Sequence, residues 1–179
     1  VTDANTCSKT GSITITEPAD ITIIENSSNV DCYGDSTGTV SLSISGGTPS
    51  YTTNWGGIDT NNLSQGTYNY TVTDANTCSK TGSITITEPN PITVNLINTT
   101  DVTDCTNPDG SIDITVSGGS GHYSYNWDNG ETTEDINNLS AGIYNVIVSD
   151  SLNPNCNTTF GPINITLPTP IIWTSTSVS

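Results

Sequence analysis

Apolar and polar residues alternate along much of the chain. The stretches 40–45, 82–87 and 112–117 alternate with a period of two. This period places successive side chains on opposite faces of a strand, so it predicts strands with one buried face. No stretch has the 3.6-residue period of a helix, and Thr, Ser, Asn and Gly, which form helices poorly, are abundant throughout. The pattern therefore predicts an all-β protein.

An internal repeat divides the chain. Residues 1–18 and 72–89 are identical, and a similar boundary recurs at Pro168. A fixed repeat of this kind indicates an array of structural units. We therefore expect the last part of an upstream repeat, two complete repeats, the start of a downstream repeat, and a longer array of which this chain is a window. Their residues are 1–18, 19–89, 90–168 and 169–179.

Each complete repeat offers about six short strands separated by turns rich in Gly, Asn and Asp. Several short strands at this spacing predict a β-sandwich rather than a parallel sheet. A repeat of this size has a small hydrophobic core, which is marginal without a covalent staple. In the first repeat the expected strands are 21–24, 39–45, 51–55, 61–63, 67–73 and 80–87.

The composition of the chain excludes several classes of function. The chain has 18 acidic residues against two lysines and no arginine, and its formal net charge is −16. A nucleic-acid binder or a protein that binds anionic membranes needs basic surface, so we expect neither partner. No apolar run is long enough for a membrane-spanning helix. Val, Ile, Leu and Phe make up only about one fifth of the residues, which is typical of disordered chains, but the alternation argues for a folded one.

The motifs of the two repeats resemble the SprB-type repeat. Each has a first cysteine, Ser-Gly-Gly, Tyr-x-x-x-Trp, Leu-Ser-x-Gly-x-Tyr, a Val-x-Asp strand end and a second cysteine. Such repeats build stalks of large surface adhesins of gliding Bacteroidetes, which the type IX secretion system exports. The resemblance implies immunoglobulin-like sandwiches and an extracellular location. It also implies a structural or adhesive role.

The aromatic residues of these motifs are candidates for the core. We expect the sandwich interior to hold Trp55, Trp127, Tyr68 and Tyr144, because a thin core needs its largest side chains. The Leu-x-x-Gly-x-Tyr spacing resembles a tyrosine corner, in which the hydroxyl holds the preceding loop. The alternative is that the tryptophans are exposed platforms on which a carbohydrate stacks.

Few residues suit catalysis or metal binding. His122 is the single histidine, so neither a zinc site nor a Ser-His-Asp triad is credible, and we expect no enzyme and no cofactor. A calcium site remains an option at Asp101, Asp104 and Asp109, since loop carboxylates suit calcium, although Asp is also an ordinary turn residue. Ser36 and Ser151 lie in Asp-Ser-x sequences that resemble the O-glycosylation motif of Bacteroidetes.

The five cysteines are expected to be oxidised in an extracellular protein. The simplest pairing lies within repeats, Cys32 with Cys78 and Cys105 with Cys156, which leaves Cys7 to a partner upstream. There is a geometric objection to this pairing. In an immunoglobulin topology the loop before strand B and the loop after strand F lie at opposite ends of the sandwich. Bridged Cα atoms must come within about 7 Å. The alternative therefore pairs Cys32 with Cys156, and we prefer the pairing within repeats because a small unit needs its own staple.

Together these observations predict tandem sandwiches in an extended rod. We expect a non-catalytic stalk or filament segment of a secreted surface adhesin, which supports attachment or gliding motility. Its partners would be neighbouring repeats, and also other copies in a fibre or a surface glycan. The alternative function is a carbohydrate- or calcium-dependent module that makes the adhesive contact itself.

Overall fold

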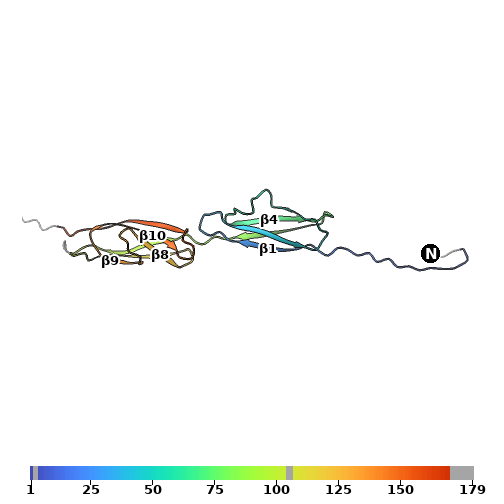
Figure 1. Ribbon diagram of the computed structural model, residues 1–179, viewed down its shortest axis with the longest axis horizontal. Helices are drawn as coiled ribbons and strands as arrows, with labels where there is room; N and C mark the ends of the chain where they lie inside the picture. The colour runs from blue at the N-terminus through green and yellow to red at the C-terminus, as the bar shows by residue number, and fades with distance from the viewer. Residues whose placement is uncertain (2–3, 104–106, 170–179) are drawn as a thin grey trace, which may run out of the picture. The chain divides into compact units, whose positions relative to one another are not determined.

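The computed structural model describes residue 1 and residues 4–103 and 107–169. All of its named elements are antiparallel strands, and no described residue is helical (Figure 1). The predicted all-β class is confirmed. The strands are β1 (Thr22–Ser28), β2 (Thr39–Ser45), β3 (Thr52–Asn54), β4 (Gly66–Thr73), β5 (Ser79–Ile86), β6 (Thr93–Thr100), β7 (Gly110–Ser117), β8 (Tyr123–Trp127), β9 (Ile136–Leu139), β10 (Gly142–Asp150) and β11 (Asn157–Ile165).

Contacts group the described residues into two units. The first contains most of β1, β2, β4 and β5 and all of β3, within 1–27, 40–60 and 67–85. The second contains β6 to β11 together with 28–39 and 61–66. The loop that carries Cys32 therefore belongs, by its contacts, to the second unit.

The second unit is a sandwich of two three-stranded sheets. One sheet has the order β6-β7-β9 and the other β11-β10-β8. This is the order of strands A-B-E and C-F-G in an immunoglobulin-like sandwich. Both sheets contribute to one core because their period-two alternation turns every second side chain inward. Along β10, for example, Tyr144, Val146, Val148 and Asp150 are buried while Ile143 and Ile147 are exposed.

The first unit has the same elements in shorter form. Its sheets are β1-β2 and β3-β4-β5. The strand expected at 61–63, which groups by its contacts with the second unit, is reduced to a single bridge between Gly38 and Leu63. Few side chains fill its core, and several alternating positions of β2 are only half-buried. The buried apolar residues of this unit are Ile21, Val40, Tyr70, Val72 and Ile84.

The Ser-Gly-Gly motif forms the turn after β2 and after β7. The first glycine of each motif, Gly46 or Gly118, has a positive φ and lies against a backbone carbonyl, that of Asp20 or Pro91. A Cβ at either position would collide with that carbonyl, so only glycine fits. The tyrosine five residues later holds the same turn, because the Tyr51 hydroxyl donates to Gly46 O and the Tyr123 hydroxyl to Gly118 O.

Candidate functional site

The predicted core aromatics have different environments in the two units. Trp127 is 2 % exposed and Tyr144 is buried, whereas Trp55 and Tyr68 are only half-buried. The expectation of a core position is therefore correct for the second repeat and wrong for the first. The tyrosine corner is present at Tyr144, whose hydroxyl donates to Ser140 O at 2.8 Å.

A longer loop explains the burial of Trp127. Twelve positions separate Trp127 from Leu139, against eight between Trp55 and Leu63. The additional residues fold over the indole: its Nε1–H donates to Thr133 O at 2.9 Å, and the Trp127 backbone N–H donates to Glu131 O at 3.0 Å. The loop of the first repeat is four residues shorter, and β3 ends one residue before its tryptophan.

Trp55 instead lies beside Tyr70 at the wall of a hollow in the first unit. The two ring centroids are 5.2 Å apart, with the planes tilted by 54°. The Tyr70 hydroxyl donates to Glu25 Oε1 at 2.7 Å, and burial together with this carboxylate raises the pKa of Tyr70 to about 12. The hollow has a volume of about 670 Å³, and its lining also includes Asn54, Asn69 and Thr71.

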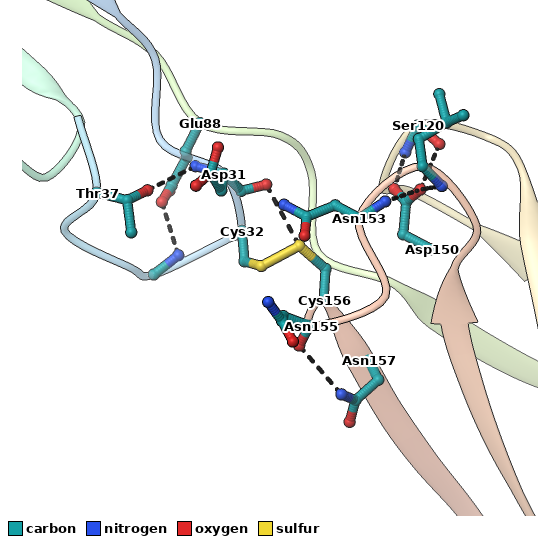
Figure 2. The surroundings of a disulfide bond; sticks show 12 residues. Asp31, Cys32, Thr37, Glu88, Ser120, Asp150, Asn153, Asn155, Cys156 and Asn157 are labelled. Atoms are coloured by element: carbon teal, nitrogen blue, oxygen red, sulfur yellow. Dashed lines mark hydrogen bonds between the residues drawn. A yellow bond between two sulfur atoms is a disulfide. The ribbon is translucent and has the colours of Figure 1, made fainter. Parts of the chain in front are cut away.

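A disulfide joins Cys32 to Cys156, with their Cα atoms 5.3 Å apart (Figure 2). The preferred pairing within repeats is thus wrong: Cys32 is not bonded to Cys78, and Cys156 is not bonded to Cys105. The alternative pairing is the one observed. The Cys78 thiol is exposed, and Cys105 lies outside the described residues, as does Asp104. The physical reason is the one that opposed the preferred pairing, namely that a loop before strand B does not reach the turn after strand F of its own sandwich.

The loop that carries Cys32 is held by hydrogen bonds on both sides of the cysteine. Before it, the Asp31 N–H donates to the Thr37 hydroxyl at 2.8 Å. After it, the Gly34 N–H donates to Glu88 Oε2 at 2.7 Å. The sulfur of Cys156 lies 3.3 Å from the carbonyl oxygen of Asp31. Since a disulfide sulfur carries no hydrogen, this is a packing contact rather than a hydrogen bond.

The turn that carries Cys156 is organised by a buried carboxylate. Asp150 is 4 % exposed, and its oxygens accept hydrogen bonds from the backbone N–H and the hydroxyl of Ser120, both at 2.6 Å (Figure 2). They also accept from the backbone N–H groups of Leu152 and Asn153. The Asp150 N–H in turn donates to Cys156 O at 2.9 Å, which closes the turn. These bonds, that from the Ser120 hydroxyl above all, hold the pKa of Asp150 below its usual 3.8.

Asp74 has the same role in the first repeat. It is 6 % exposed, its oxygens accept from the N–H groups of Thr48, Asn76 and Cys78, all at 2.9 Å, and its own N–H donates to Cys78 O at 2.9 Å. These bonds, that from Thr48 first, lower its pKa. Sequence analysis assigned no role to either aspartate. The signal was available, because in Val-x-Asp the alternation places the aspartate on the inward face together with the valine.

We expect acid to destabilise the protein through these aspartates. The folded pKa of Asp150 lies below the unfolded value near 3.8, so its contribution to stability is complete above that value and is lost as the pH falls through the folded pKa. The melting temperature should therefore drop below about pH 4. Asp150→Asn should lower the melting temperature at pH 7 and flatten the acid drop. Asp113→Asn, which removes the same charge from an exposed strand position, is the control. An Asp150→Asn profile parallel to that of the wild type would contradict this role.

The calcium and glycosylation candidates lie in different settings. A carboxylate oxygen of Asp101 accepts from the Thr166 N–H at 2.7 Å, and Asp109 accepts from the N–H and hydroxyl of Thr103. Both carboxylates therefore serve as caps for backbone groups, and these bonds lower the pKa of each. Among the described residues no group of three acidic, histidine or cysteine side chains is arranged to hold a metal ion. Ser36 and Ser151 are exposed, and the Ser36 hydroxyl forms a hydrogen bond with the Ser64 hydroxyl. His122 is exposed.

Both repeats match a known protein family. The family model of the SprB repeat matches residues 24–60 and 96–132. The chain contains two SprB repeat matches. Each match includes the first cysteine and the tryptophan of its repeat, Cys32 with Trp55 and Cys105 with Trp127. The resemblance to the SprB repeat is thereby confirmed.

The chain was also compared with solved structures and with curated proteins. The chain is similar to a solved structure of three N-terminal domains of the highly immunogenic outer capsid protein of bacteriophage RB49. The two are 20 % identical, the TM-score is 0.47, and the similarity covers 82 % of this chain and 59 % of that one. No curated protein matches the chain. No helix among the described residues is both long and apolar enough to cross a membrane.

Proposed function

We propose that this chain is a non-catalytic structural segment of a secreted cell-surface protein, a stalk that supports adhesion or gliding. SprB repeats occur in secreted surface proteins, which supports an extracellular location. The observation that carries the proposal is the disulfide from Cys32 to Cys156. It links the first cysteine of one repeat to the second cysteine of the next and spans 124 positions of the sequence.

The buried carboxylates and the disulfide support a structural role more than a catalytic one. The two carboxylates most deeply buried, Asp74 and Asp150, are fully engaged in holding turns. A disulfide persists in an oxidising compartment, which agrees with secretion. The net charge of −16 would keep a long surface protein soluble and self-repelling. The partners of such a segment would be neighbouring repeats of its own chain.

The hollow beside Trp55 favours a second candidate function, the recognition of a carbohydrate. An aromatic ring flanked by Asn and Thr side chains is a setting in which a sugar ring can stack and form hydrogen bonds. The equivalent Trp127 is buried, so only the first repeat would have this capacity.

Binding of the isolated chain to glycans separates the two functions. Beads coated with the oxidised chain should show no saturable binding to a glycan array, because a spacer makes no contact of its own. Inserted between a surface anchor and a known adhesive domain, the same chain should preserve capture of that domain's ligand. The control beads carry a Trp55→Ala variant. Saturable binding that this variant abolishes would refute the spacer function and support recognition of carbohydrate by the hollow.

A further inference from the structure

The turn that carries Cys78 is a second copy of the turn that carries Cys156. Each follows a Val-x-Asp sequence whose aspartate lies at the end of β10 or just after the end of β4, and in each the buried aspartate donates its N–H to the cysteine carbonyl at 2.9 Å. Each aspartate also accepts a hydrogen bond from the backbone of the preceding Gly-Gly turn, from Thr48 or Ser120. The difference between the copies is covalent: Cys156 is bonded to Cys32, and the Cys78 thiol is exposed.

We propose that Cys78 forms a disulfide with the cysteine of a Cys32-type loop that belongs to another copy of the repeat. By Cys32-type loop we mean the sequence of residues 29–38. The independent support is the bond already present at the equivalent position, where a loop of this type is joined to a turn of this type. The partner is a cysteine other than Cys32, since Cys32 is occupied by Cys156.

The bond forms by thiol–disulfide exchange. The two thiols lose two electrons and two protons in total, and the disulfide of a periplasmic or extracellular oxidant, an oxidoreductase or oxidised glutathione, accepts them and becomes two thiols. An exposed thiol is accessible to such an oxidant. The loop cysteine would approach the sulfur of Cys78 as Cys32 approaches the sulfur of Cys156, to which it is bonded (Figure 2).

Such bonds would overlap along an array. Each bond would run from the first cysteine of one repeat to the second cysteine of the next repeat. The second cysteine of a repeat is followed along the chain by the first cysteine of the next repeat, as Cys78 is followed after 27 positions by Cys105. A pulling force would then pass through disulfides and these short connections. The longer segments between them would carry no tension.

The sequence offers a direct test. Because residues 1–18 repeat 72–89, residues 19–71 placed before Val1 create one more complete repeat with its natural junction. The added copy carries Tyr33→Phe as a mass label at an exposed position, and Cys7→Ser removes the sequence duplicate of the Cys78 peptide. The chain is oxidised in glutathione buffer, alkylated under denaturing conditions and digested with a protease that cleaves at acidic residues, and the linked peptides are identified by mass.

We expect the labelled loop peptide to be joined to the Cys78 peptide, and the unlabelled Cys32 peptide to be joined to the Cys156 peptide. The control chain has Cys32→Ser in the added copy only. Its Cys78 should be fully alkylated, while its link between Cys32 and Cys156 persists and reports correct folding. The proposal is overturned if the labelled cysteine is alkylated, if it joins Cys105, or if Cys78 joins the unlabelled Cys32. None of these outcomes affects the glycan-binding assay, so this inference and the spacer function fail independently.

Discussion

Pulled from its two ends, the oxidised chain should lengthen far less than the reduced chain. The disulfide closes the 124 positions between Cys32 and Cys156, so those residues cannot extend even after they unfold. An extended chain spans roughly 3.3–3.6 Å per residue, so reduction should release about 400 Å of additional length. Single-molecule force spectroscopy with and without a reductant measures this difference directly.

Two variants test whether the disulfide between Cys32 and Cys156 limits the extension. Cys156→Ser should show the full extension without any reductant, because Cys32 loses its partner. Cys78→Ser should behave like the wild type, because its thiol closes no loop in this chain. Equal extensions for the oxidised wild type and Cys156→Ser would show that the bond does not form. In the chain-entropy account a loop of this length also stabilises the folded state by about 5 kcal/mol, so Cys156→Ser should unfold at lower denaturant concentration.

The two tryptophans should differ greatly in their contributions to stability. Trp127 is 2 % exposed and donates its indole N–H to Thr133 O, so Trp127→Ala should reduce the free energy of unfolding by about 3–5 kcal/mol. Trp55 is half-buried at the wall of a hollow, and Trp55→Ala should cost about 1–2 kcal/mol. Urea titration followed by far-UV circular dichroism compares the two.

A conservative variant separates packing from hydrogen bonding at Trp127. Trp127→Phe keeps an aromatic ring and removes the indole N–H, so it should recover a large part of the loss caused by Trp127→Ala. Similar losses for Trp55→Ala and Trp127→Ala would contradict the view that the longer loop of the second repeat buries its tryptophan.

The strands were predictable because one face of each sheet is buried. The range 39–45 agrees in full with β2, and 67–73 and 80–87 agree with β4 and β5 within one residue. The strand expected at 61–63 failed to extend beyond one bridge, since pairing there depends on a partner strand rather than on local pattern. The roles of Asp74 and Asp150 were accessible in principle from the same alternation, but a buried aspartate is unusual enough that its position alone does not reveal its partners.

What the sequence determined by itself was the all-β class, the repeat and the family resemblance, because period-two alternation, glycine turns and spaced motifs are local properties of the chain. The tertiary structure decided which sulfurs meet and which tryptophan is buried. The disulfide depends on segments far apart in sequence, since Cys32 meets Cys156 across 124 positions. The burial of Trp127 depends on how the loop that follows it folds back, since Thr133 accepts the hydrogen bond of its indole N–H. Both disulfide pairings are compatible with the spacing of the cysteines along the chain. The folded positions of the Cys32 loop and the Cys156 turn decide between them.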